Sequence, residues 1–190
     1  MSTLKVLGLA GAVLTGVVLA GAVAAASAAA PASPGLGRPA TAAEVQAIDI
    51  SIPPDGHTLP PSRNPAAQGA VIFAGKCQVC HGSAGVGGPN DRLTGGVGSL
   101  ATPKPVKTIA SYWPYATTAF DYIRRAMPLT APQSLSNDEV YALVAYLLSV
   151  DGVVARDAVL DAKTLPLVKM PNRDGFQSWE ARYRPKGAGG

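Results

Sequence analysis

The stretch Cys77-Gln78-Val79-Cys80-His81-Gly82 decides how the rest of this chain is interpreted. Two cysteines separated by two residues can each form a thioether with a vinyl group of one haem, and a histidine directly after the second cysteine is then held beneath the iron. The motif therefore predicts one covalently attached haem c, with Cys77 and Cys80 as attachment points and His81 as an axial ligand. Both cysteines of the chain are used in this site, which leaves none for a disulfide.

Two other interpretations of the cysteine pair fit the sequence less well. A zinc site would have to recruit His57 and His81, but His57 precedes the cysteines and His81 directly follows Cys80, so the usual spacing of paired histidines is missing. A redox-active dithiol would need a βαβ context, and the surrounding pattern is helical. His57 lies in a proline-rich loop, where a histidine is typically exposed to solvent, so we do not expect it to ligate the iron.

The sequence before the motif predicts a helix that leads into it. Asn64 is a favourable N-cap, and Pro65 suits the first helical position, where its missing N–H costs nothing. Gly69, Ile72 and Phe73 then share one face of the helix. We expect Gly69 to allow another helix to approach closely, while Phe73 fills the space beside it.

The sequence after the motif is too rich in glycine for a regular helix or strand. Residues 82–98 contain seven glycines. Such a loop lets the backbone pass close to a haem, and one of its carbonyls can accept the free N–H of His81; Pro89 is the candidate for that carbonyl. A phosphate-binding P-loop is excluded because no Gly-Lys-Ser/Thr sequence follows the glycines.

A second helix is predicted over residues 116–126 from its apolar stripe. It must end there because Pro128 disfavours helical backbone at the residue before it. Met127 therefore lies in an irregular loop from which its sulfur can be aimed at the iron. A thioether opposite the histidine raises the potential of the iron and closes its sixth position, which suits electron transfer. We predict Met127 as the second ligand in preference to Met170, with a buried core position as the alternative for either methionine.

A third helix begins at the capping box Ser136-Asn137-Asp138-Glu139 and ends at Gly152. Its apolar positions recur at i, i+3, i+4 and i+7; they are Val140, Leu143, Val144 and Leu147. We expect this helix to pack across the first one at Gly69 and Phe73.

The first residues of the chain predict export. Residues 1–30 carry one charge, at Lys5, followed by an apolar stretch and a small-residue end, which is the pattern of a secretory signal peptide cleaved near Ala28 to Ala30. An uncleaved membrane anchor is the alternative, because the uncharged run over residues 6–30 is long enough to span a bilayer. We therefore expect a periplasmic protein that contacts the membrane only if the leader is retained.

The mature chain has room for one domain with a core of its own. Residues 31–63 form a lead-in rich in proline and alanine, with a helical turn or two at residues 42–48. Residues 64–152 form the haem domain. Residues 153–190 are predicted to be an extended tail strapped to that domain, with the last ten residues disordered.

The charge of the chain is mildly positive. Lysine and arginine number 16 against 12 aspartates and glutamates, and loss of Lys5 with the leader leaves 15 against 12, or +3. The balance allows steering towards an acidic protein surface, but without a long basic run it does not support nucleic-acid binding. Arg124 and Arg125, at the end of the second helix, either pair with a haem propionate or form a solvated face.

Together these elements resemble a class I cytochrome c over about residues 64–152, in the order helix, CxxCHG, Gly/Pro loop, helix, Met-Pro, capped helix. The resemblance implies an all-α fold around one covalent haem, with extended N- and C-terminal segments. Three runs resemble more narrowly the cytochrome subunit of periplasmic sulfur-compound dehydrogenases, the SoxD type and the related sulfite dehydrogenase cytochrome. They are YWPYATT at 112–118, FDYIRRAMPLTAPQSLSNDEVYALVAYLL at 120–148 and LDAKTLPLVKMPNRDGF at 160–176.

This resemblance implies a molybdenum-containing partner subunit that oxidises a sulfur group and passes electrons to the haem. By position, Cys77 and Cys80 attach the haem, and His81 and Met127 ligate its iron. The expected function is a monohaem electron-transfer subunit that delivers electrons to a downstream cytochrome or oxidase, with no catalysis by this chain alone. Some members of the SoxD type carry two haems, whereas this chain has a single CxxCH.

Two other functions compete with this expectation. A free-standing periplasmic cytochrome c shuttle would need no catalytic partner, but it would also need neither the lead-in nor the tail. Catalysis at an open or cysteine-ligated iron is the weakest hypothesis, because no cysteine remains free and a methionine ligand is at hand.

Overall fold

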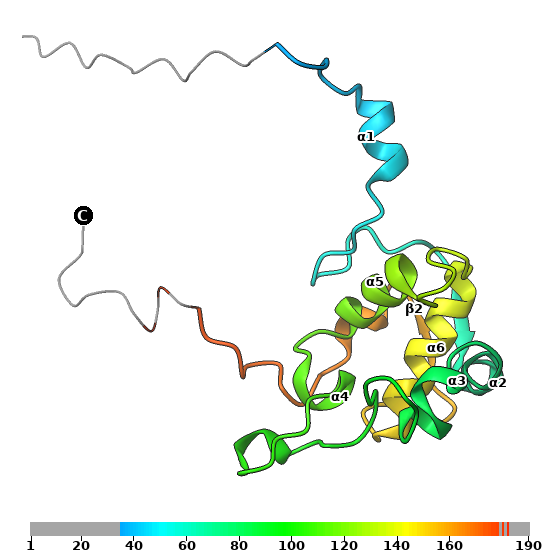
Figure 1. Ribbon diagram of the computed structural model, residues 1–190, viewed down its shortest axis with the longest axis vertical. Coiled ribbons are helices and arrows are strands. Elements are labelled where there is room, and N and C mark those ends of the chain that lie inside the picture. Colours follow the sequence, from blue (N-terminus) through cyan, green and yellow to red (C-terminus); the bar gives the residue numbers. More distant parts are fainter. Residues whose placement is uncertain (1–34, 179, 181, 183–190) are drawn as a thin grey trace, which may run out of the picture. The chain divides into compact units, whose positions relative to one another are not determined.

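The computed structural model describes residues 35–178, 180 and 182, and the chain divides into two units, residues 1–40 and 41–190 (Figure 1). The predicted signal peptide and nearly all of the last ten residues, for which the sequence predicts disorder, lie outside the described residues. In the first unit, residues 35–40 contain no helix or strand.

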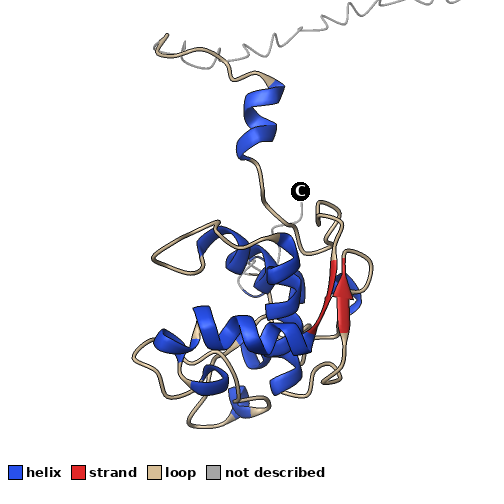
Figure 2. Cartoon of the chain, turned by 90° about the vertical axis from the view of Figure 1, so that its right-hand side faces the viewer, coloured by secondary structure: helices blue, strands red, loops and turns tan. Residues whose placement is uncertain are grey.

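The second unit is mostly helical, as the sequence predicts, with one small strand pair as an addition (Figure 2). Its α-helices are α1 (Ala42–Ile48), α2 (Ala66–Lys76), α3 (Gln78–His81), α4 (Ile109–Tyr112), α5 (Ala116–Ala126) and α6 (Asn137–Val150). The shorter elements are the 3-10 turns η1 (Ser83–Gly85), η2 (Ser99–Ala101) and η3 (Leu165–Leu167), and the strands β1 (Arg63–Pro65) and β2 (Val159–Asp161). Among the helices described, none is both long and apolar enough to cross a bilayer.

The contact between α2 and α6 confirms the predicted close approach at Gly69. A Cβ atom at this position would lie 1.9 Å from the Ala142 carbonyl oxygen, a distance that no side chain can occupy. Beside it, Phe73 is buried, and its ring lies 5.4 Å from that of Tyr146 between centroids. Glycine therefore lets the two backbones touch while the neighbouring aromatic pair fills the space around them.

The start of α2 differs from the prediction. The helix begins at Ala66, with Pro65 as its N-cap and no side-chain cap, whereas the sequence predicts an N-cap at Asn64. Asn64 instead pairs with Leu160 in the antiparallel β1–β2 ladder, and Pro65 stays extended at φ −77° and ψ 151°. Strand pairing with a segment distant in sequence has displaced the local capping preference.

The other two long helices follow their sequence signals. Helix α5 occupies the predicted 116–126 and ends at Met127. Helix α6 opens on the predicted capping box, in which the Ser136 side chain accepts a hydrogen bond from the Glu139 N–H, and Gly152 with φ +70° follows its end. The apolar face of α6 is buried throughout, so this helix forms the centre of the core.

The hydrophobic core also draws on the segments before and after the haem domain. Ile52 and Leu59 of the lead-in are buried in it, together with Leu160, Leu165 and Met170 of the tail. By contrast, α1, which appears where a helical turn or two is predicted, buries no residue. The tail is thus less extended than predicted, because its strand and its 3-10 turn are built around buried leucines.

Candidate haem site

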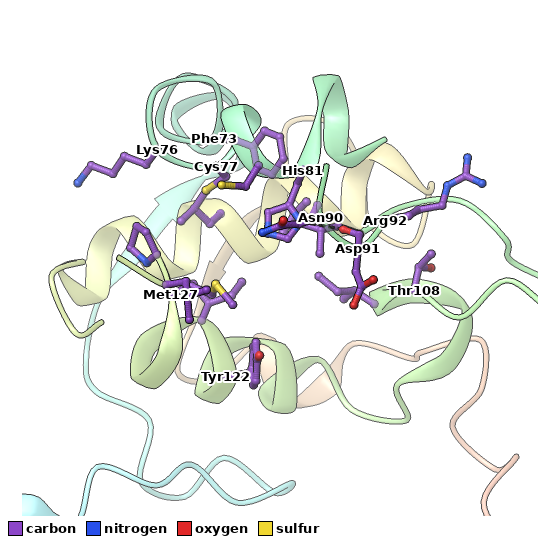
Figure 3. A pocket seen from close by; sticks show the side chains of 18 of the residues that line it. Phe73, Lys76, Cys77, His81, Asn90, Asp91, Arg92, Thr108, Tyr122 and Met127 are labelled. Atoms are coloured by element: carbon purple, nitrogen blue, oxygen red, sulfur yellow. Dashed lines mark hydrogen bonds between the residues drawn. The ribbon is translucent and has the colours of Figure 1, made fainter. Parts of the chain in front are cut away.

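A cavity of about 710 Å³ lies among α2, α3, the loop after them, α4, the end of α5 and α6. This volume is within the range of pockets that hold cofactors and other small molecules. Most of its wall is apolar, including Phe73, Ile109 and Leu143. The four residues that the sequence predicts as haem attachment points and ligands, Cys77, Cys80, His81 and Met127, all line it (Figure 3).

The two cysteines come from the junction of α2 and α3. Cys77 is the residue between the helices and Cys80 lies within α3, so this junction brings both cysteines to the cavity. Both are half-buried, and neither forms a disulfide. Burial raises the pKa of the Cys77 thiol to about 11, against a smaller opposing effect of the neighbouring Lys76 charge.

His81, the last residue of α3, is oriented by a backbone carbonyl. Its Nδ1 lies 2.7 Å from the oxygen of Asp91. Because a carbonyl oxygen only accepts, Nδ1 carries the hydrogen and donates it, which leaves the lone pair on Nε2. A histidine fixed in this tautomer is ready to bind a metal through Nε2.

The carbonyl that holds His81 is two residues later than predicted. Pro89 lines the cavity, but Asp91 supplies the acceptor. The loop first folds back on the haem motif: the Asn90 N–H donates to the Cys80 oxygen, and a Cβ at Gly88 would lie 2.2 Å from that same oxygen. Residues 88–90 are therefore packed against α3, and the residue that follows them, Asp91, places its carbonyl beside the imidazole.

Met127 approaches the cavity from another wall. It is the C-cap of α5, half-buried, and Figure 3 shows its side chain directed into the cavity across from Cys77. Met170 packs in the hydrophobic core and is 3% exposed, which is the alternative the sequence leaves open for a methionine. His57 is exposed, with its Nδ1 2.8 Å from Asp55 Oδ1.

The two arginines considered as propionate partners do not line the cavity. Arg124 Nη1 donates to the Ile50 oxygen at 3.0 Å, and Arg125 forms an ion pair with Asp121 one helical turn earlier. Helix geometry accounts for the second contact, since residues four apart are neighbours on the helix surface. The partner of Arg124 lies 74 residues away in the chain and leaves no local signal.

Other residues of the site have no clear signal in the sequence. The basic side chains at the cavity are Lys76, Arg92 and Lys107. Tyr112 and Trp113 also line it, at the end of the four-residue helix α4. No short sequence pattern places Tyr112 and Trp113 at the cavity, so their position in its wall depends on tertiary packing.

The residues present fit a covalently bound haem. One wall offers two thiols spaced by two residues and an imidazole with a free Nε2, another offers a thioether, and the remaining surface is largely apolar. This donor set is that of a helical protein that holds its iron in a c-type haem.

Comparison with known proteins agrees. The chain belongs to the cytochrome c family, whose sequence model, described as "Cytochrome c", matches residues 66–151, and haem c is its covalent cofactor. It is similar to a chain in the crystal structure of the sulfane dehydrogenase SoxCD from Paracoccus pantotrophus, with 41% sequence identity and a TM-score of 0.73. The match covers 80% of this chain and 76% of that chain. No curated protein matches this chain.

Proposed function

We propose that this chain is the monohaem electron-transfer subunit of a sulfur-compound dehydrogenase. It takes electrons from a molybdenum-containing catalytic partner and passes them to a downstream cytochrome or oxidase. The observation that carries the proposal is the meeting of His81 and Met127 in one cavity that also holds both cysteine side chains. The similarity to SoxCD supports the choice of partner.

In this proposal each site residue has a separate role. Cys77 and Cys80 form the two thioethers, and His81 binds through the Nε2 that its bond to the Asp91 carbonyl leaves free. Met127 would supply the second ligand to the iron, which would raise its potential and close it to other ligands. The bound haem supplies a one-electron couple, and the chain's work is to hold these ligands and exclude water.

Replacement of Met127 by leucine tests the ligand assignment. Leucine has nearly the volume of methionine but no thioether, so the cavity stays filled while the ligand is lost. We expect Met127→Leu to lower the reduction potential and to let carbon monoxide bind the reduced protein. Met170→Leu is the matched control, and it should leave both properties unchanged because leucine keeps the core filled at a position that does not line the cavity. An unchanged potential in Met127→Leu would remove Met127 from the site.

The partner is tested on the untagged protein purified gently from its native source. Molybdenum and haem iron are measured across the same column peak, and sulfite or another sulfur donor is then added. Near-stoichiometric molybdenum in a peak whose haem becomes reduced supports the dehydrogenase subunit. Haem iron alone, in a small peak that sulfur donors do not reduce, would favour a free-standing shuttle.

We also propose that the protein is exported and works in the periplasm after cleavage near Ala28 to Ala30. The support is the sequence of residues 1–30, with its single charge at Lys5 and its small-residue end. The intact mass of the purified protein, with one haem added, distinguishes a mature chain that begins near residue 30 from one that retains the leader as an anchor.

A further inference from the structure

A short segment beyond the cytochrome c match touches the wall of the haem cavity. We call residues 170–176 the C-terminal strap; the family match ends at residue 151. Met170 anchors the strap in the core, at 3% exposure. Two successive turns then shape it, in which the Arg173 N–H donates to the Met170 oxygen and the Gly175 N–H donates to the Asn172 oxygen.

The strap holds Tyr112 at two points. The Asn172 side-chain Nδ2 donates to the Tyr112 carbonyl oxygen at 2.6 Å, and the Phe176 ring meets the Tyr112 ring edge to face, with 5.2 Å between centroids. A third contact lies close by, where the Arg173 guanidinium stands 4.1 Å from the centre of the Tyr115 ring. Figure 1 shows the chain after η3 running past α4.

These contacts matter because α4 is too short to hold itself in place. A helix of four residues has no stability of its own, so its position depends on contacts with the rest of the fold. Its first turn is closed by the Thr108–Ser111 capping box. At its other end the Tyr112 carbonyl lacks an intrahelical partner, and Asn172 supplies the donor.

Tyr112 and the adjacent Trp113 both line the haem cavity. We propose that Asn172 is a positioning residue of the haem site: through the Tyr112 carbonyl, the strap fixes the Tyr112–Trp113 wall against the haem and limits the access of water from that side. The inference deepens the proposed function, and it rests on the haem binding in this cavity. A drier cavity favours the reduced haem, which carries less charge, so the strap raises the reduction potential.

Two independent substitutions remove the contact. Asn172→Ala deletes the donor. Gly175→Ala leaves Asn172 in place, but the new Cβ would lie 1.8 Å from Asn172 Oδ1, so the amide must leave its present position. Gln177→Ala is the control, because it removes an exposed amide from the same stretch of chain.

The experiment measures the reduction potential of the full-length holoprotein, together with the rate at which cyanide binds the oxidised form. We expect Asn172→Ala and Gly175→Ala to shift the reduction equilibrium about threefold towards the oxidised form, which is about 30 mV for one electron. Cyanide binding should accelerate several-fold, while Gln177→Ala matches the parent protein in both measurements.

Thermal unfolding separates positioning from stability alone. Lower unfolding temperatures with an unchanged potential and an unchanged cyanide rate in both variants would overturn the inference and leave Asn172 a structural residue. If the parent protein carries its full complement of haem but sulfur donors do not reduce it, the proposed partner is contradicted. The comparison of potentials and cyanide rates between the variants still tests the role of Asn172.

Discussion

The approach of α2 to α6 at Gly69 gives a prediction whose size follows from the structure. In Gly69→Ala the added methyl group would lie 1.9 Å from the Ala142 oxygen and 2.7 Å from Tyr146 Cβ. Ordinary contact begins near 3.4 Å, so the two helices must separate by about 1.5 Å, the difference between these distances. Neither obstacle is the end of a flexible side chain, and the helices must therefore move.

The separation would loosen the packing around Phe73 as well. Overpacking a core costs about 1–3 kcal/mol, and a clash with backbone on this scale belongs at the upper end of that range. Alanine regains about 1 kcal/mol in helix propensity over glycine. We therefore expect Gly69→Ala to lower the free energy of unfolding by about 2 kcal/mol and the unfolding temperature by roughly 4–8 °C.

A second glycine of α2 provides the control. A Cβ at Gly75 would meet nothing within 4 Å, so Gly75→Ala should be neutral or stabilising by up to about 1 kcal/mol. Unfolding of both holoproteins is followed by the helical circular dichroism signal at equal haem content. Equal unfolding temperatures for Gly69→Ala and Gly75→Ala would refute the close contact as the reason for glycine at position 69.

Three further predictions concern charge and the tail. Burial raises the pKa of Asp151, so protonation of this carboxyl stabilises the fold; the stabilisation is complete below about pH 3.9 and is lost as pH rises through the folded pKa. Asp151→Asn keeps an acceptor for the Gly95 N–H and should flatten this pH dependence in thermal melts between pH 3 and 7. The hydrogen bond from Lys76 lowers the pKa of Glu139, so this pair stabilises the fold above about pH 4.3. Lys76→Ala should lower the free energy of unfolding in urea by less than about 1 kcal/mol at pH 7, and should leave it unchanged in acid. Leu165→Ala, at a fully buried position beyond the family match, should cost about 2–5 kcal/mol by the same assay, and a surface-like cost would contradict its place in the core.

Sequence signals that act over a few residues predicted their elements well. The capping box Ser136–Glu139, the end of α5 before Pro128 and the spacing of Gly69 and Phe73 each depend on neighbours within one or two helical turns. The CxxCH motif and the Met-Pro pair predicted the residues that meet in the cavity for the same reason, since each is a short pattern with its own geometry.

Features that depend on distant partners were not predictable from the sequence. The start of α2 moved because Asn64 pairs with Leu160, and Arg124 turned to the Ile50 carbonyl. The acceptor for His81 shifted to Asp91 because the glycine loop folds back on α3 before passing the imidazole. The sequence predicts an extended tail over residues 153–190, and nothing local in Asn172 indicates that it meets Tyr112.

The β1–β2 ladder has a consequence for how this subunit can be tethered. Its six residues stand just before α2 and shortly after α6, so the chain enters and leaves the cytochrome segment at one edge. Asn64 and Pro65 of β1 and the residues of β2 do not line the haem cavity. A linker that joined the two sides of this edge would make a circular permutant feasible, with new ends opened in an exposed loop. Likewise, a fusion partner could be attached at this edge, where the segment both begins and ends, and the residues that face the haem would stay free for electron exchange.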